Sequence, residues 1–353
     1  PNINNFSKEK IVATVRSDII IPEIFVPYVT EATTNLDKFL QSGVVAPMAE
    51  LNGTEGGDFV NIPFWSANLS GDQEVLSDSA SLSPGKISAS KQIGVQLHRG
   101  RAFEARDLAS IAAGSDAMAA IGNKLAAYIA NQRQKDLLAS LEGVFGSLNS
   151  NDSNSAFFTM CVDSESGDSP TVLSARTVAQ ARSKFGEQGD KLTTVAMHSS
   201  TFYDLQERKL IDYVSTADAR GTTTTQSGGS VANAYGGDPG VPTYCGLNVI
   251  VSDDVTKTGS GASTEYAVYF FKAGAVGSGE GPSLDIEQDR DILAKSDAIS
   301  YDAHYCYHPG GSKWAVTTTN PTVAQLQTVG NWSKVYEDKN LGIARATVVS
   351  NYD

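Results

Sequence analysis

Two histidines and a cysteine near the C-terminus have a spacing that would suit metal binding. His304, Cys306 and His308 alternate along Ile299–Tyr307, which we interpret as a strand, so their side chains share one face. Imidazole nitrogen and thiolate sulfur are ligands that zinc prefers. Asp302 lies on the same face, but no clear fourth ligand accompanies the set. We therefore interpret these residues as ordinary members of a sheet and expect no metal and no cofactor.

An acidic run precedes this segment. Four carboxylates alternate along an expected strand and turn: Asp285, Glu287, Asp289 and Asp291. Paired carboxylates can perform acid–base catalysis. Arg290 and Lys295 are close in the sequence, however, and no pattern of a cleft accompanies the run. We therefore favour ion pairing over catalysis at this position.

Two other patterns resemble catalytic or phosphate-binding motifs. His198 follows an expected buried strand, but no acid is placed to orient it toward Ser199 or Ser200. We expect the two serines to cap a helix. Gly274–Gly279 follows a strand without a helix behind it, and we interpret it as a turn. Because the sequence also lacks nucleophile-elbow, Walker, zincin and EF-hand motifs, we expect no enzyme.

Charged residues are dense just after a long alternating segment: Arg99, Arg101, Glu104 and Arg106. Two interpretations stay open for this cluster. It is either a solvated turn at the base of a hairpin, or a set of salt bridges to a second subunit.

The hairpin and a long helix are the elements around which the chain is organised. Ile87–Leu97 alternates with period two and is expected to pair with Asp58–Trp65, with a connection over 66–84 that is rich in Ser, Asp and Gly. A two-stranded ribbon is at best marginally stable alone in water. We therefore expect a neighbouring copy of the chain to cover it.

A short helix is expected over Phe103–Ala113, followed by a long one that ends near Phe145. Ser115 is its expected N-cap, with Asp116 in the first turn. At 1.5 Å per residue this rod is roughly 40–45 Å long.

The remaining chain alternates helices and strands and indicates an α+β fold. Pro1 to about Phe25 is expected to be an extended arm, and Thr216–Pro242 has few signals of order. Further helices are expected over Pro27–Leu40, Thr171–Gly186, Ser199–Tyr213 and Val323–Thr328. Further strands are expected over Ala156–Val162, Thr193–Met197, Leu247–Val251, Tyr266–Phe271, Ser283–Glu287, Lys313–Thr318 and Gly342–Val349.

Composition limits the function classes. The chain has 353 residues, 41% of them hydrophobic, and a formal net charge of -13. This charge argues against a protein that wraps nucleic acid with a basic face, although an acidic wall facing packed DNA would not adhere to it. The three cysteines, Cys161, Cys245 and Cys306, form no disulfide pattern and favour a reducing compartment. No segment approaches the roughly 20 apolar residues that span a bilayer.

Several short stretches, together with the order of the elements, resemble the major capsid proteins of tailed bacteriophages, which have the Hong Kong 97-like fold. The similar stretches are Val195–His198, Gly246–Asp254, Phe271–Ala275, Glu287–Asp291, His308–Trp314, and Asn331–Trp332 with Val335–Tyr336 and Lys339. The resemblance extends from about Ile20 to the end of the chain.

The resemblance implies a shell subunit with the following divisions: an N-terminal arm and helix (1–50), an extended hairpin loop (51–97), a peripheral domain with the spine helix (98–169), an axial domain (170–300), and a return to the peripheral domain (301–353). It implies no catalytic residues. The expected interface residues are Arg99, Arg101, Glu104, Arg106, Glu287 and Arg290.

The implied function is an icosahedral viral shell of pentamers and hexamers that encloses double-stranded DNA without sequence-specific contact. The expected partners are copies of the chain itself and scaffolding, portal and decoration proteins. The expected location is the virion, after assembly in the host cytoplasm, with no membrane. Alternatives are a cargo-enclosing nanocompartment of the same fold, an α+β hydrolase, and an adhesion module, for which strand repeats are missing.

Overall fold

The computed structural model of the chain describes residues 42–53, 57–65, 87–114, 116–148, 154–162, 171–214, 241–261, 264–281 and 284–352, besides Phe39 and Gln73. The expected arm, nearly all of the first helix and of the hairpin connection, and most of Thr216–Pro242 lie outside these residues. Contacts divide the chain into two units. The described part of the first unit lies within 98–132 and 284–304, and that of the second lies within 35–97, 133–281 and 305–353.

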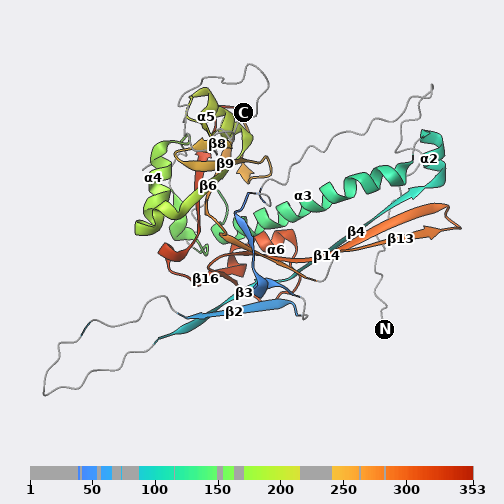
Figure 1. Cartoon of the computed structure of the whole chain (residues 1–353), viewed down its shortest axis with the longest axis horizontal. Coiled ribbons are helices and arrows are strands. Elements are labelled where there is room, and N and C mark those ends of the chain that lie inside the picture. Colours follow the sequence, from blue (N-terminus) through green and yellow to red (C-terminus); the bar gives the residue numbers. More distant parts are fainter. Residues whose placement is uncertain are drawn as a thin grey trace, which may run out of the picture. The chain divides into compact units, whose positions relative to one another are not determined.

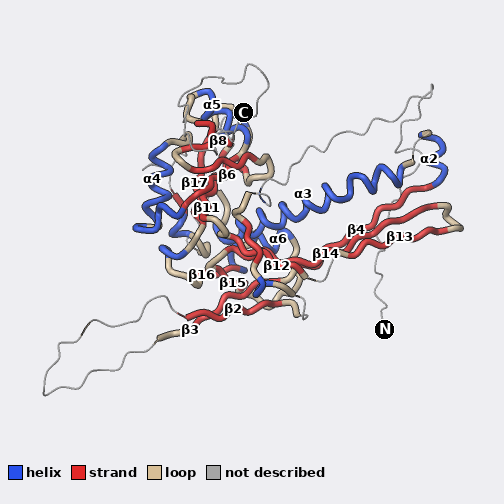
Figure 2. Tube along the Cα trace, in the orientation of Figure 1, coloured by secondary structure: helices blue, strands red, loops and turns tan. Residues whose placement is uncertain are grey.

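An eight-stranded sheet is the core of the second unit, with strand order β5–β17–β11–β6–β9–β8–β7 and β10 beside β11 (Figures 1 and 2). The strands are β5 (Cys161–Val162), β6 (Leu192–Met197), β7 (Asp212–Val214), β8 (Val241–Tyr244), β9 (Leu247–Val251), β10 (Lys257–Thr258), β11 (Glu265–Lys272) and β17 (Ile343–Val349). Antiparallel neighbours β17 and β6 flank β11. Tyr266–Phe271 is buried throughout, as its continuous apolar run indicates for a strand covered on both faces.

Helices of the second unit agree with the sequence in position more than in length. Among the described residues, the helices that lie wholly in this unit are α4 (Ala175–Lys184), α5 (Ser199–Glu207) and α6 (Val323–Gln327), with short 3-10 turns at Ala49–Leu51, Phe158–Met160, Gly186–Lys191, Val329–Asn331 and Asp338–Asn340. The expectation of helix to Tyr213 was wrong. Lys209 has φ 58, a left-handed conformation that ends the helix, and the residues beyond it form β7.

Part of a second sheet belongs to this unit. This part consists of β1 (Val45–Pro47), β12 (Val276–Glu280) and the last residues of β14 (Ser296–Pro309). The interpretation of Gly274–Gly279 as a turn was therefore wrong over most of its length. Gly277 and Gly279 lie in β12, where a Cβ at Gly277 would come 2.5 Å from the sulfur of Met48. The glycines let the strand pass closely under Met48 and Leu51.

Two small antiparallel sheets complete the second unit. β2 (Phe59–Trp65) pairs with β3 (Ala89–Val95) in the register Phe59↔Val95 to Trp65↔Ala89, which confirms the expected hairpin. β15 (Ser312–Trp314) pairs with β16 (Trp332–Lys334) and is shorter than expected. The strand expected over Ala156–Val162 is likewise reduced to β5.

The described part of the first unit combines three strands with two helices. β4 (Leu97–Arg106) and β13 (Asp285–Asp291) both pair with β14, and α2 (Asp107–Ala113) follows β4 directly. The expectation of helix from Phe103 was wrong, because Phe103–Arg106 continues the strand. Phe103 and Tyr301 each pack edge-on against Tyr128 of the neighbouring helix, with ring centroids 5.4 and 6.2 Å apart from it.

That helix, α3 (Ala117–Phe145), is the expected long rod and runs through both units. Ser115, its expected N-cap, lies outside the described residues. The Asp116 carboxylate accepts the amides of Met118 and Ala119 at 2.9 and 3.2 Å, so Asp116 performs this capping role. At the other end, buried Arg345 donates to the carbonyls of Gly146 and Ser147. None of the helices in the described ranges has the length and apolar character to cross a membrane.

The two units do not coincide with the divisions expected at residues 170 and 300. β17, from the end of the chain, lies in the same sheet as β6, β9 and β11. β13 and the first part of β14 belong instead with β4 in the first unit. The division into axial and peripheral domains stays a prediction about the assembled state.

Candidate assembly surface

The inner end of the β2–β3 ribbon is anchored to its own chain by one glutamine. The Gln92 side-chain oxygen accepts the Gly311 amide at 2.9 Å and lies 3.2 Å from Nε2 of His308. Its amide nitrogen donates to the Tyr336 hydroxyl at 2.7 Å. All of these partners come from 308–336, the region whose His-Pro-Gly and Asn-Trp stretches carried the resemblance. Their role is therefore to hold the base of the ribbon.

The outer end of the ribbon is more exposed. Phe64 packs edge-on against Tyr336 at 4.8 Å, whereas Trp65 is 66% exposed and Ala89–Lys91 is exposed. A cavity of about 390 Å³ opens here, lined by Phe64, Trp65, Ser88, Ala89, Ser90, Val335, Tyr336, Glu337 and Asn340. The expectation of an uncovered ribbon thus holds for this end, while the inner end is covered by the chain itself.

The predicted charge cluster lies on a strand and not on a turn. Arg99, Arg101, Glu104 and Arg106 all belong to β4, and Arg106 occupies the N-cap position of α2. The exposed Arg101 guanidinium lies 5.8 Å from the centroid of the Phe103 ring. Because β4 pairs with β14, these side chains are presented along a rigid edge of the first unit.

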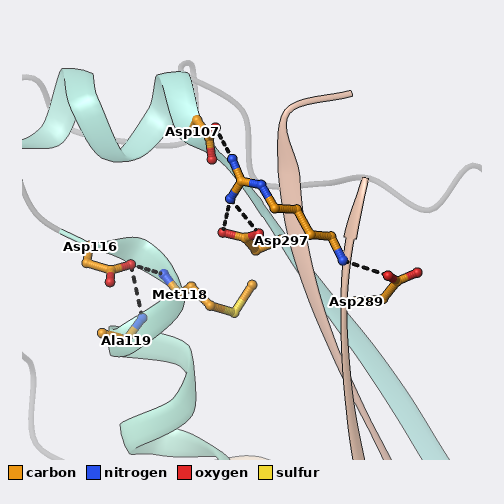
Figure 3. Close-up of polar contacts among 7 residues, drawn as sticks. Asp107, Asp116, Met118, Ala119, Asp289 and Asp297 are labelled. Atoms are coloured by element: carbon orange, nitrogen blue, oxygen red, sulfur yellow. Dashed lines mark hydrogen bonds and ion pairs between the residues drawn. The ribbon is translucent and has the colours of Figure 1, made fainter. Parts of the chain in front are cut away.

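Arg290 connects three segments at the far end of the first unit (Figure 3). Its guanidinium donates to both carboxylate oxygens of Asp297, at 2.8 and 2.9 Å, and to Asp107 at 2.7 Å. Hydrogen bonding to Asp297, followed by the charge of Asp107, raises the pKa of Arg290 above its usual value. Glu287, the other candidate on β13, is exposed opposite Ser300. The sequence favoured ion pairing of Arg290 within the acidic run, but Arg290 pairs instead with Asp107 and Asp297 of its own chain.

Four large apolar side chains are exposed at the end that Arg290 organises: Leu108 at 61%, Ile111 at 76%, Ile292 at 70% and Leu293 at 96%. We call these four residues the apolar tip. Leu108 and Ile111 lie on α2, and the other two lie in the turn between β13 and β14, where the Asp107 amide donates to the Lys295 carbonyl at 2.9 Å. Figure 1 shows α2 and this turn at the same end of the three strands.

Sequence reasoning missed the apolar tip, although a signal was present. Leu108 and Ile111 are spaced by three residues, which places them on one helix face, and Ile292–Leu293 interrupts an acidic segment at a turn. Each apolar residue alone is unremarkable on a protein surface. Only their common location at one end of the unit makes them a candidate interface.

The three metal candidates do not converge. His308 contacts Gln92, and burial lowers the pKa of His308 to about 4. Burial also raises the pKa of Cys306 to about 12, which keeps the thiol protonated and a poor ligand. His304 instead faces His98 on β4, with 2.6 Å between their Nδ1 atoms. Nowhere in the described ranges do three His, Cys, Asp or Glu side chains form a set able to hold a metal.

The histidine considered for nucleophilic catalysis has a structural role. His198 is 6% exposed, and its Nδ1 accepts the Ser200 amide at 3.2 Å, so His198 itself caps α5 and the expectation that the serines would do so was wrong. Its Nε2 lies 3.8 Å from Asp253. An open depression of about 530 Å³ lies over the same helix and is lined by Ser199, Ser200, Tyr203, Gln206, Glu207 and Tyr352. In this arrangement the imidazole nitrogen nearest the serines is occupied by a backbone amide.

Comparison with known proteins is consistent with a subunit that carries exposed contact surfaces. Residues 22–342 match the Gp13-like family, described as major capsid protein 13-like. The chain is 35% identical over 338 residues to the major capsid protein of Bacillus phage SPP1, covering 93% of this chain and 96% of that protein.

Solved structures show the same fold at low sequence identity. The capsid subunit of cyanophage Pam1 superposes with a TM-score of 0.59 at 12% identity, covering 94% of this chain and 98% of that one. The capsid of Ralstonia phage GP4 gives a TM-score of 0.59 at 11% identity over 94% of this chain and 96% of that one. The fold is therefore the α+β, Hong Kong 97-like capsid fold. Because the family match spans residues 22–342 and the SPP1 protein is similar over 93% of the chain, this chain belongs to the Gp13-like family of tailed-phage major capsid proteins and is a structural subunit of a viral shell, not an enzyme.

Proposed function

We propose that copies of this chain assemble into pentamers and hexamers that close into an icosahedral shell around double-stranded DNA. The observation that carries this proposal is the apolar tip, because Ile111, Ile292 and Leu293 are each at least 70% exposed in the single chain. Exposed apolar clusters mark interaction surfaces, and burying one such side chain contributes about 1.5–3 kcal/mol. A neighbouring subunit of the same shell is the partner that meets every copy.

The charged edge of the first unit supplies specificity in this proposal. The expected interface residues are Arg99, Arg101, Glu104, Arg106, Glu287 and Arg290. Charged groups at the rim of a contact set orientation and exclude wrong arrangements more than they add affinity. Arg290 acts indirectly, since its bonds to Asp107 and Asp297 fix the strands and the helix that carry the apolar tip.

The ribbon and the net charge support the remaining parts of the proposal. The exposed outer end of β2–β3, with Trp65 and the cavity beside Tyr336, suits contact with an adjacent copy. A net charge of -13 suits a wall that encloses DNA without binding its bases. We further propose scaffolding, portal and decoration proteins as partners, assembly in the host cytoplasm, and final location in the virion.

The apolar tip is tested with the double variant Ile111→Ser and Leu293→Ser. Both side chains are exposed, so the subunit keeps its circular dichroism spectrum and thermal stability. Particle yield, measured by light scattering and negative-stain microscopy, falls by about tenfold or more, because each subunit loses a few kcal/mol of contact. Val323→Ser, at an exposed apolar position of α6 that is 44% exposed, is the matched control and leaves the yield unchanged. A normal yield of closed particles from the double variant contradicts the proposal.

The charged edge is tested by reversing one charge. Arg101→Glu impairs particle formation more than folding, whereas Arg101→Lys keeps the charge and retains assembly. The defect of Arg101→Glu is measured as particle yield across a salt series, since exposed ion pairs weaken with ionic strength. Equal yields from the two variants would remove Arg101 from the interface.

Enclosed DNA is tested on particles purified from infected cells and treated with nuclease. Nucleic acid that remains protected inside the shell is measured by its ultraviolet absorbance.

A further inference from the structure

Two histidines from separate strands converge on the first unit. His98 of β4 and His304 of β14 place their Nδ1 atoms 2.6 Å apart, with ring centroids separated by 4.8 Å and an interplanar angle of 66°. We propose that His98 and His304 together bind a divalent transition-metal ion of the kind that prefers imidazole, such as Zn²⁺ or Ni²⁺. Neither residue is part of the proposed subunit interface, so this inference stands independently of it.

The geometry suits two nitrogen ligands on one ion. The two Nδ1 atoms face each other within hydrogen-bond distance, so without metal one of them carries the proton. Each neutral ring can hold its proton on Nε2 instead, and in that tautomer both Nδ1 lone pairs face a common ion. Two nitrogens bound to a common ion at about 2.0–2.1 Å lie about 3 Å apart when the angle at the ion is between square and tetrahedral. Binding therefore requires the two rings to separate by well under about 1 Å, which side-chain rotation supplies.

The surroundings leave room for the other ligands. The pair is on an exposed face, so water can complete the coordination. Asp302 precedes His304 by two residues on the same face of β14 and lies beside Gly100, where the missing side chain leaves its carboxylate space to turn. With two protein ligands, or three after Asp302 rotates, we expect moderate affinity and a preference for metals that bind imidazole over Mg²⁺ or Ca²⁺.

The other histidines cannot provide this site. The chain has four histidines in all. His198 is 6% exposed and caps α5, and His308 is 2% exposed and contacts Gln92. An ion held by His98 and His304 would cross-link β4 to β14, two paired strands of the first unit. Metal binding would therefore stiffen this unit and leave the eight-stranded sheet unaffected.

The proposal is tested by titrating the untagged full chain at neutral pH with NiCl₂ and with ZnCl₂ in a calorimeter. We expect about one equivalent per chain with micromolar affinity. His98→Gln and His304→Gln each weaken binding by roughly 10- to 100-fold, a range typical for damage to a metal site. Both positions are accessible, so circular dichroism confirms that the variants fold. The wild-type chain also gains thermal stability on addition of Ni²⁺, by mass action, and the two variants do not.

Asp302→Asn and Asp289→Asn form a matched pair of exposed carboxylates on adjacent strands. Asp302→Asn lowers affinity modestly if its oxygen completes the site, whereas Asp289→Asn, at the exposed far end of β13, leaves the binding constant unchanged. Two results overturn the proposal: no heat of binding up to millimolar metal, or binding that persists unchanged in both His98→Gln and His304→Gln.

Discussion

The two halves of helix α3 have opposite environments, although the helix is continuous. In the second unit, Leu137–Val144 is buried on nearly every side, and Leu137, Leu141 and Val144 have no exposed surface. In the first unit, only Leu125 and Ile129 are buried, and Gly122, Asn123 and Lys124 are exposed. The same element is therefore a core helix in one unit and a surface helix in the other.

This difference indicates where each unit finds its stability. The second unit pairs several of its buried polar groups internally: Asp136 accepts the Tyr305 hydroxyl at 2.6 Å, and Gln92 binds Gly311 and Tyr336. The first unit has β13 exposed at all seven positions and carries the apolar tip. A unit of this kind leaves apolar surface to be covered by another molecule, which is the physical requirement for a shell subunit.

The largest expected effect is on the second unit, at Arg345. Its guanidinium binds the Gly146 and Ser147 carbonyls and lies 5.4 Å from the Phe145 ring centroid. Arg345→Met leaves the buried Gly146 carbonyl and the partly buried Ser147 carbonyl without this donor and removes a charge from the C-terminal end of the α3 dipole, so we expect a loss of about 4 kcal/mol in the free energy of unfolding. Urea denaturation followed by tryptophan fluorescence measures it. A change below about 0.5 kcal/mol, the ordinary range for a surface substitution, would show that Arg345 is dispensable.

The next effect is a steric one in the same half of α3. A Cβ at Gly143 would come 2.5 Å from Nε1 of Trp332 and would overlap the Leu326 carbonyl that this nitrogen donates to at 2.8 Å. Gly143→Ala therefore separates α3 from α6 and costs about 3 kcal/mol, more than the helix propensity of alanine returns. Thermal unfolding of the variant measures the cost. Wild-type stability in this variant would mean that α6 does not pack closely on α3.

A third effect depends on pH. Burial lowers the pKa of His308 to about 4, below its ordinary value of 6.5. The unfolded chain therefore binds a proton between these values and the folded chain does not, so stability is complete above pH 6.5 and decreases as the pH falls toward 4, by roughly 3 kcal/mol for this group. Urea titrations at several pH values measure the slope. His308→Asn is expected to flatten this slope; an equal slope in this variant and in the wild-type protein would contradict the assignment.

The smallest effect has the opposite sign and lies in the first unit. A Cβ at Gly122 would meet no atom within 4 Å, and the residue is exposed in α3. Gly122→Ala should therefore stabilise the chain by about 0.5–1 kcal/mol, through helix propensity and a less flexible unfolded state. Differential scanning calorimetry checks this gain. A destabilised Gly122→Ala would mean that this half of α3 is packed as closely as the other.

Local pattern alone was sufficient for several elements of this fold. Period-two alternation predicted the pairing of Asp58–Trp65 with Ile87–Leu97, which the structure confirms over Phe59–Trp65 and Ala89–Val95, and residue types predicted the strand Tyr266–Phe271, which is buried throughout. Helical spacing predicted α3 and α6, and α6 begins with a capping box formed by Thr322 and Gln325. Helical spacing, strand alternation and helix capping depend on residues close together in the sequence, so a local pattern is sufficient to predict them.

Contacts between distant segments were decided only by the tertiary structure. Sequence patterns drew attention to His304 but gave no sign that His98, 206 residues away, lies beside it. They likewise showed Gly277 and Gly279, but not that the side chains of Met48 and Leu51 leave no room for a Cβ there. Residue types and periodicity predicted many of the elements and carried the family resemblance. The fold fixed which side chains meet, because a pairing between strands far apart in the chain depends on register and packing that no local window contains.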